Sequence, residues 1–402
     1  MHDVSAPPLH MRRNGFDPVP ELSALRDAEG VARVRTVFGV EAWLVTRFED
    51  VRTVLSHPEL YSNARVPPLL RPSGAEEGGT DGDGTQAAGT RDGNLIGSDP
   101  PEHTRLRRML APEFTSRRIR RLEPRIRQIV EEHLDAMERG GPPADLVADF
   151  ALPVPSLVIC ELLGVPYADR DDFQRTSRKM LDVSLPPEER MAAAEESRAY
   201  IAELVSAMRE DPGDDLLGML VREHGDDLTT AELAGIGSLL LIAGHETTSN
   251  MLSLGTLALL RHPDQLALVR DEPDRVETAV EELLRWLSIV HSGTFKTTTT
   301  EVRLGGRTLA PGELVICSLP AANRDPALVS APDTLDVGRS ALGHVAFGHG
   351  VHHCLGAHLA RMEMRIAFPA LLRRFPGLRL AGEPVYRSLT VVYGLETMPV
   401  AW

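Results

Sequence analysis

Cysteine is scarce in this chain, and long apolar runs are missing. Only 3 of the 402 residues are cysteines, too few for a disulfide framework and typical of a reducing compartment. No stretch reaches the roughly 18 uninterrupted apolar residues of a membrane span. Residues 1–15 are polar and basic and lack the apolar core of a secretory signal. These absences predict a cytoplasmic protein without a membrane anchor.

Positive charge is also in deficit. The net charge of −15 at pH 7 opposes any general affinity for nucleic acid. Apolar residues make up 42% of the chain, which is enough for a sizeable core, and neither an internal repeat nor a clean linker divides it. The pattern is mostly helical, with short strand-like segments. It predicts one large domain over residues 1–402, mainly α with small β-sheets (α+β).

Strand patterns and one polar stretch interrupt the helical sequence. Residues 31–46 and 298–319 have the alternation and turn residues of β-hairpins, and residues 389–393 are strand-like. Residues 66–92 are rich in glycine, proline, aspartate and threonine and offer almost nothing to bury. We expect a flexible lid loop there, within the domain.

Arginine is concentrated in one part of this acidic chain. Between residues 105 and 127 there are nine arginines and two glutamates. Such a run fits a solvated, amphipathic pair of helices. It fits equally well a basic docking surface for an acidic partner.

The most informative stretch places a thiol in a glycine-rich turn. Cys354 follows Gly350 and precedes Gly356 and a helical pattern over residues 355–374. The free N–H groups and the dipole of a helix start stabilise a thiolate. Glycines allow the backbone to turn or to approach a ligand closely. Such a sulfur suits the role of axial ligand to a flat metal cofactor, for which heme is the obvious candidate.

Two other interpretations of Cys354 remain. A lone cysteine is often a small buried hydrophobic residue. The neighbouring histidines also allow a zinc site, but structural zinc sites usually combine two ligand pairs across a spacer. The other cysteines, Cys160 and Cys317, are far away in the sequence and have no C-x-x-C partner. The spacing therefore disfavours zinc.

A second signal is a long apolar helix with a polar interruption. Thr229-Thr-Ala-Glu232 is a capping-box pattern, and about thirty mainly apolar positions follow it. Such a helix is normally buried. Residues 243–250 interrupt it with glycine, an acid and several hydroxyls, which loosen the hydrogen-bond ladder. Buried polar groups are costly unless they are paired or used, so this segment is either a tolerated kink or a functional notch.

Together these motifs resemble the cytochrome P-450 family of heme-thiolate monooxygenases. Residues 347–356 match its pattern F-x-x-G-x-x-x-C-x-G, and residues 243–248 match A-G-x-[DE]-T-T. The resemblance is closest to soluble actinobacterial members. It implies the cytochrome P-450 fold with its long central helix. It also implies heme b (iron protoporphyrin IX), with Cys354 as the iron ligand and Phe347 and Ala243 beside the cofactor.

The same resemblance implies catalytic residues on the long helix. Gly244 would leave room for dioxygen. Glu246 and Thr247 match the family's acid and alcohol, which would pass protons to dioxygen as it is reduced. A thiolate opposite them would favour cleavage of the O–O bond.

The segment Glu282-Leu-Leu-Arg285 resembles the family's E-x-x-R motif. By themselves, residues at i and i+3 share a helix face and usually form an ordinary surface salt bridge. The resemblance implies instead a buried structural ion network, with Arg339 as its third member.

A further segment resembles the family's D-P-P-x-H-x-x-x-R stretch, at residues 99–107. The resemblance implies that His103, Arg107 and His352 bind the heme propionates. Where bacterial relatives commonly have arginine, this chain has Lys296. Lysine donates as a point charge without a fork, so we expect the propionate contact to survive with looser geometry.

The implied activity is insertion of one atom of O2 into a small hydrophobic organic molecule. Hydroxylation is the first expectation and epoxidation a second. The expected substrate is a secondary metabolite such as a polyketide or macrolide, a terpenoid or a peptide, which would place the chain in antibiotic biosynthesis. Ferredoxin and ferredoxin reductase would supply electrons from NAD(P)H to a monomer.

Two alternatives to this activity stay open. One is a non-catalytic heme-thiolate binding or recognition protein, and the other is a helical binding protein without heme. Substrate specificity is not readable from the sequence. The resemblance implies pocket walls at Tyr61–Ile96, Pro166–Arg190, Ala243, Ile289–Thr294 and Val391–Tyr393.

Overall fold

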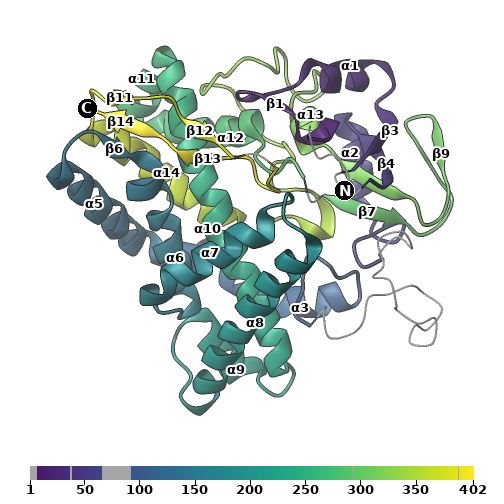
Figure 1. The fold of residues 1–402 in the computed structure, drawn as a ribbon, viewed down its shortest axis with the longest axis horizontal. Helices are drawn as coiled ribbons and strands as arrows, with labels where there is room; N and C mark the ends of the chain where they lie inside the picture. The colour runs from purple at the N-terminus through teal and green to yellow at the C-terminus, as the bar shows by residue number, and fades with distance from the viewer. Residues whose placement is uncertain (1–6, 37–38, 66–91, 293, 388) are drawn as a thin grey trace. The chain divides into compact units, whose positions relative to one another are not determined.

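The computed structural model describes residues 7–36, 39–65, 92–292, 294–387 and 389–402. The chain forms two compact units. Figure 1 shows the helices and strands of both, coloured by residue number. The first comprises residues 1–109, 290–333 and 343–354, and the second comprises residues 110–289, 334–342 and 355–402. The lid loop predicted for residues 66–92 lies outside the described residues except for Asp92. The single domain over residues 1–402 stays a prediction.

The first unit contains a mixed five-stranded sheet with the order β3-β4-β10-β7-β5. The strands and helices of this unit are η1 (Leu9–Met11), β1 (Arg13–Asn14), β2 (Asp17–Pro18), α1 (Pro20–Ala28), β3 (Val31–Arg35), β4 (Glu41–Val45), α2 (Phe48–Ser56), β5 (Tyr61–Ser62), α3 (Glu102–Leu110, whose last residue belongs to the second unit), β7 (Phe295–Thr298), β8 (Val302–Leu304), β9 (Arg307–Leu309), β10 (Leu314–Cys317), α13 (Leu319–Asn323) and η9 (Gly350–His352).

Two hairpins of this unit follow the sequence patterns. Strands β3 and β4 pair antiparallel, which confirms the hairpin predicted for residues 31–46. Within residues 298–319, β8 pairs with β9 across Gly305 and Gly306, whose φ angles of 54° and 75° suit a tight two-residue turn. Strand β10 does not extend this hairpin. It pairs with β4 and β7 instead, because all four of its side chains are buried, as in a central strand.

The second unit is mainly helical. Its elements are η4 (Ala111–Phe114), α4 (Ser116–Ile119), η5 (Arg120–Leu122), α5 (Glu123–Gly140), β6 (Ala144–Asp145), η6 (Val147–Ala151), α6 (Pro153–Leu163), η7 (Tyr167–Asp169), α7 (Arg170–Leu181), α8 (Pro187–Glu210), α9 (Leu216–His224), α10 (Thr230–Arg261), α11 (Pro263–Asp271), η8 (Pro273–Arg275), α12 (Val276–Leu287), α14 (Ala357–Arg374), β11 (Arg379–Leu380), β12 (Val385–Tyr386), β13 (Leu395–Thr397) and β14 (Pro399–Ala401).

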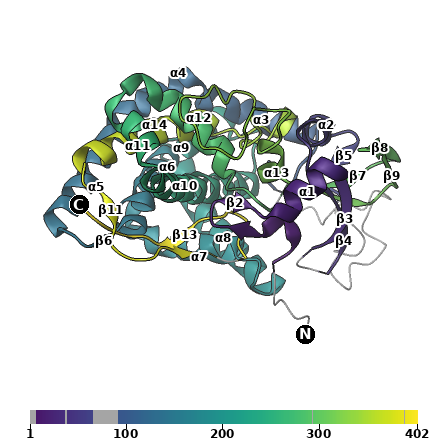
Figure 2. The same cartoon turned by 90° about the horizontal axis from the view of Figure 1, so that it is seen from above.

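Helix α10 is the core of the second unit. Figure 2 looks nearly along its axis, and α6, α8 and α14 all contact it. It begins at the predicted place, because Thr229 accepts from the backbone of Glu232 while the Glu232 carboxylate accepts from the backbone N–H of Thr229. It ends where His262 precedes Pro263, since the residue before proline is disfavoured in the helical region. Most of its side chains are buried, as predicted.

The predicted loosening of this helix at residues 243–250 is wrong. The segment is helical without a break. The Thr247 hydroxyl donates to the Ala243 carbonyl at 2.7 Å, so it is satisfied within the helix. Gly244 serves packing, because a Cβ there would lie 2.7 Å from the Ile159 side chain of α6. The glycine thus lets α6 approach α10 closely.

The strand predicted for residues 389–393 is also wrong. Thr390 makes one isolated bridge with Asp182, and the paired strands β12 and β13 flank the segment instead. Leu389 has φ 53°, which a strand does not accommodate. Among the described residues, no helix combines the length and the apolar character that crossing a membrane requires.

Candidate functional site

Cys354 lies in a tight loop of the first unit, directly after η9. Its backbone N–H donates to the carbonyl oxygen of Phe347 at 2.9 Å. Gly350 has φ 69°, and a Cβ on it would lie 2.4 Å from the carbonyl oxygen of Leu55 on α2. Glycine alone tolerates both conditions. The loop therefore packs against α2 while the Cys354 side chain stays exposed.

The other two cysteines have a different environment. Cys160 and Cys317 are buried, and burial raises the pKa of each thiol to about 12. The interpretation of a cysteine as a small buried residue therefore fits these two and not the exposed Cys354. Within the described ranges, no three His, Cys, Asp or Glu side chains gather as metal ligands. The zinc alternative thus receives no support there.

Four basic side chains predicted to bind propionates all belong to the first unit. The rings of His103 and His352 lie with their centroids 4.2 Å apart. In each ring Nε2 is buried and makes no hydrogen bond within the described part of the chain. Lys296 is buried and donates to the side-chain oxygen of Asn63. Arg107, on α3, is partly buried.

Burial and mutual repulsion disfavour the protonated, charged forms of these four side chains. Burial lowers the pKa of His103, and Arg107 and Lys296 lower it further, against the opposing effect of Asp99. Burial lowers the pKa of His352 to about 3, helped by Lys296, His103 and Arg107. Burial also lowers the pKa values of Lys296 and Arg107. An anion bound here would relieve both the desolvation and the mutual repulsion.

The donor set therefore suits carboxylates. Two imidazoles with an unused ring nitrogen and two cations are the partners that a dicarboxylate needs. Heme carries two propionates, so these residues fit the cofactor that the sequence motifs imply.

The predicted catalytic side chains lie on α10, in the second unit. The helix is buried on most sides, but Ala243 is exposed and Leu240, Gly244 and Thr247 are partly exposed. These positions recur at helical spacing and form one accessible face. Glu246 points elsewhere and is only 1% exposed. The helix thus combines an open face with an adjacent buried acid.

Glu246 is held by a residue that sequence reasoning missed. Its Oε2 accepts from Nη1 of Arg387 at 2.7 Å. The Nε atom of Arg387 donates at 3.3 Å to Glu396, which is half exposed on β13. Burial opposes the charge of Arg387, but the two carboxylates outweigh it and raise its pKa. Arg387 is 141 residues from Glu246, so no local pattern could have linked them.

The predicted ion network lies wholly within the second unit. Arg285 donates to both oxygens of Glu282, at 2.7 and 2.8 Å, and both side chains are fully buried. Glu282 Oε1 also accepts from the backbone N–H of Asp336 at 3.0 Å and lies 3.5 Å from Nε of Arg339. Sequence spacing did not reveal a second link, in which Arg361 of α14 donates to Glu281 of α12 at 2.6 and 2.8 Å.

The arginine-rich stretch is only partly neutralised. Ion pairs join Arg105 to Glu102, Arg118 to Glu113, Arg125 to Glu161 and Arg127 to Glu123. Arg117 and Arg121 are exposed and form no ion pair with a described residue.

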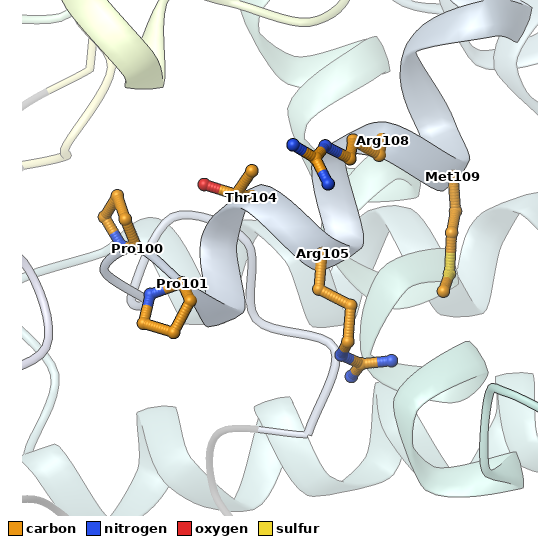
Figure 3. A pocket seen from close by; sticks show the side chains of 6 residues that line it. All are labelled: Pro100, Pro101, Thr104, Arg105, Arg108 and Met109. Carbon is orange, nitrogen blue, oxygen red and sulfur yellow. The ribbon is translucent and has the colours of Figure 1, made fainter.

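A surface pocket of about 690 Å³ lies at the start of this stretch, in the first unit. Figure 3 shows Arg105 and Arg108 leaving α3 in different directions around it. Its lining residues are Pro100, Pro101, Thr104, Arg105, Arg108 and Met109. Two of these six carry positive charge, so the pocket is basic.

Comparisons with known proteins agree with the motifs. The family model described as Cytochrome P450 matches residues 187–380. The chain is 50% identical to "Cytochrome P450 FAS1" of Rhodococcoides fascians, over 98% of both proteins. It is 44% identical to "Pentalenic acid synthase" of Streptomyces avermitilis, over 96% of this chain and 95% of that one.

Solved structures show the same relationship. P450 StaH from biosynthesis of the glycopeptide antibiotic A47934 is 48% identical, with a TM-score of 0.86 over 99% of this chain and 100% of StaH. CYP105P1 in complex with filipin I is 41% identical, with a TM-score of 0.90 over 99% of both chains. The similarity therefore extends over nearly the whole chain, in sequence and in fold.

Replacing Glu282 by alanine tests the buried ion network. It leaves the Arg285 guanidinium buried without its partner carboxylate, so we expect a loss of about 3–5 kcal/mol in the free energy of unfolding. Urea denaturation measures the change. The control is Glu123→Ala, which breaks the exposed pair with Arg127 and should cost about 0.5 kcal/mol or less. Equal losses in the two variants would contradict a structural role for Glu282.

Proposed function

Since the chain belongs to the cytochrome P450 family of heme-thiolate monooxygenases, we propose that it binds heme b through Cys354 and oxidises a secondary metabolite. The observation that carries the proposal is the combination found in the first unit. An exposed thiol lies in a glycine-dependent loop, and the same unit holds two imidazoles whose Nε2 atoms bond to no described residue. When bound, the heme supplies the iron at which dioxygen is reduced and one oxygen atom is transferred.

The side chains that would hold this cofactor have distinct tasks. Cys354 supplies the thiolate. His103 and His352 donate through Nε2 to the propionates, and Arg107 adds a guanidinium that suits a carboxylate. Lys296 contributes a point charge, and its bond to Asn63 fixes the direction in which it points.

The remaining members of the cofactor site follow from the same motifs. Phe347 belongs to the loop that carries Cys354, and its carbonyl oxygen holds that loop closed. Ala243 lies on the accessible face of α10, where a small side chain leaves room for a flat ligand. We assign both to the surroundings of the heme.

Proton supply is the task of α10. Thr247 carries its hydroxyl on the accessible face, beside Gly244, which adds no side chain there. Glu246 is the adjacent acid, and it can replace a proton that the hydroxyl has given up. Arg387 holds Oε2 of Glu246 and leaves Oε1 to exchange protons.

The substrate class is inferred from the relatives. The names of similar proteins include a pentalenic acid synthase, a nocardicin C N-oxygenase and a P450 from glycopeptide antibiotic biosynthesis. We infer a small hydrophobic metabolite, such as a polyketide or macrolide, a terpenoid or a peptide. Hydroxylation is the first reaction to test and epoxidation the second.

The electron supply is inferred from charge. Ferredoxins are acidic carriers, and Arg117 and Arg121 offer exposed positive charge without internal ion pairs in the described structure. A monomer that receives electrons from NAD(P)H through a ferredoxin reductase and a ferredoxin fits this arrangement.

Cys354→Ser tests the cofactor ligand. A serine hydroxyl does not replace the thiolate, so the reduced carbon-monoxide complex should lose its strongly red-shifted Soret band and turnover should cease. The absorption spectrum and product formation are measured. Cys160→Ala, which changes a buried thiol, should keep both. A parental spectrum in Cys354→Ser would overturn the proposal.

Thr247→Ala tests the proton relay. The variant should bind heme and substrate normally, while electrons are diverted to released hydrogen peroxide. We expect product formed per electron pair to fall by about tenfold or more, because a positioned proton donor is lost. The control is Thr256→Ala, which removes a similar bond, from a hydroxyl to the carbonyl of Leu252. Unchanged coupling in Thr247→Ala would refute the relay.

Neutralising Arg117, Arg118 and Arg121 together tests the docking surface. Reduction of the heme by ferredoxin should slow by about tenfold at low ionic strength and converge with the parent rate at high salt, because steering by surface charge is screened. Stopped-flow reduction measures it. The control removes three other exposed charges, at Arg35, Arg303 and Arg373. Equal rates in both triple variants would exclude this dock.

A further inference from the structure

Two hydrogen-bond acceptors face each other inside the second unit, and no described residue donates to either. His245 is fully buried and Glu246 is 1% exposed. Nε2 of His245 lies 3.7 Å from Oε1 of Glu246. Both atoms are buried and make no hydrogen bond within the described residues. Such orphaned atoms are rare in folded proteins and call for a physical explanation.

The hydrogen bonds around the pair determine which atoms are left over. Nδ1 of His245 lies 2.6 Å from the carbonyl oxygen of Leu241, which can only accept, so Nδ1 carries a hydrogen. In the neutral ring, Nε2 then presents a lone pair. Glu246 uses Oε2 to accept from Arg387, which leaves Oε1. The aromatic ring of Phe173 packs edge-on against the imidazole, with centroids 5.4 Å apart, and helps to exclude water.

Several charged groups act on the pair. Burial lowers the pKa of His245, while Glu246 and the Leu241 carbonyl raise it and Arg387 and Arg178 lower it. Arg387 follows β12, and Arg178 lies on α7 and is 3.7 Å from Glu396. The charge of His245 therefore depends on the groups around it, with Glu246 first among those that favour the protonated ring. A proton between two interacting groups belongs to both.

We propose that His245 and Glu246 hold one proton in common, between Nε2 and Oε1, in the resting protein. The separation of 3.7 Å exceeds a hydrogen bond, so the shared proton draws Nε2 and Oε1 together and then gives each of them a partner. Arg387 is a positioning residue, because its bond to Oε2 keeps Oε1 turned toward the ring. One form of the pair is an imidazolium beside a carboxylate, and the other is an imidazole beside a carboxylic acid. The two forms differ only in the position of the proton.

The pair is a proton store for catalysis. Inserting one oxygen atom from O2 consumes two electrons and two protons and releases one water. When Glu246 gives a proton to the Thr247 hydroxyl, the pair is left as neutral imidazole and carboxylate, and one proton from solvent restores it. The half-exposed Glu396 bonds to the same Arg387, so the ion chain that positions Glu246 extends to the surface. The use of the shared proton in catalysis rests on the proton relay through Thr247 proposed above. The presence of that proton between His245 and Glu246 does not depend on the relay.

Spectroscopy of the reduced carbon-monoxide holoprotein, which is diamagnetic, tests the proton directly. We expect either a protonated Nε2 signal in nitrogen-15 spectra of labelled histidine or an infrared carbonyl band of a carboxylic acid. His245→Gln assigns the first signal, and Glu246→Gln should abolish the second and change the first. An unprotonated Nε2, together with no carboxylic acid band lost in Glu246→Gln, would overturn the proposal.

Glu363 supplies the matched control. It is another buried glutamate, its Oε2 makes no hydrogen bond to a described residue, and burial raises its pKa well above the usual value. Its carboxylic acid band should disappear in Glu363→Gln and persist in Glu246→Gln. A band that responds to Glu363→Gln alone would show that the buried acid proton lies there and not at Glu246.

Coupling measurements then test the use of the proton. His245→Gln cannot store a proton, so product formed per electron pair should fall by about three- to tenfold, with a larger loss as pH rises. Unchanged coupling at all pH values would overturn the store. If the spectroscopic signals are present but Thr247→Ala leaves coupling unchanged, the relay fails and the shared proton stands. If Thr247→Ala uncouples the enzyme but the signals are absent, the shared proton fails and the relay stands.

Discussion

A polar group removed from water costs free energy until something hydrogen-bonds to it. This constraint shapes both candidate sites. In the first unit, His103 and His352 each bury a ring nitrogen that has no partner among the described residues, and Lys296 of the same unit buries its ammonium. In the second unit, on α10, His245 buries Nε2 and Glu246 buries Oε1, and neither atom bonds to a described residue. Each arrangement is incomplete until a ligand or a proton fills it, and that incompleteness distinguishes these sites from ordinary buried ion pairs.

The Glu282–Arg285 pair shows the contrast. Both oxygens of Glu282 are used, by Arg285 and by the backbone of Asp336, so this cluster needs nothing from outside the protein. Its function is to hold α12 to the segment that carries Asp336. The complete satisfaction of Glu282 is what a structural network requires.

Local patterns in the sequence predicted those features that depend on neighbouring residues. They failed where a feature depends on a tertiary contact or on an unusual backbone angle. The capping box at Thr229 and the hairpin turn at Gly305 and Gly306 depend on neighbouring residues, so the sequence was sufficient. The bond from Arg387 to Glu246 depends on the tertiary fold, and no periodicity could reveal it. Residues 389–393 were expected to form a strand because the β-branched and aromatic residues in them favour one, but the backbone at Leu389 is left-handed.

The interpretation of Gly244 needed the structure for another reason. Its missing side chain was taken as a weakness of the helix, yet it is a steric accommodation for Ile159. The two positions on α6 and α10 are therefore complementary in size. Any redesign that enlarges residue 244 must shorten residue 159 at the same time. How closely α6 can pack against α10 is thus set by the combined size of two side chains rather than by either one.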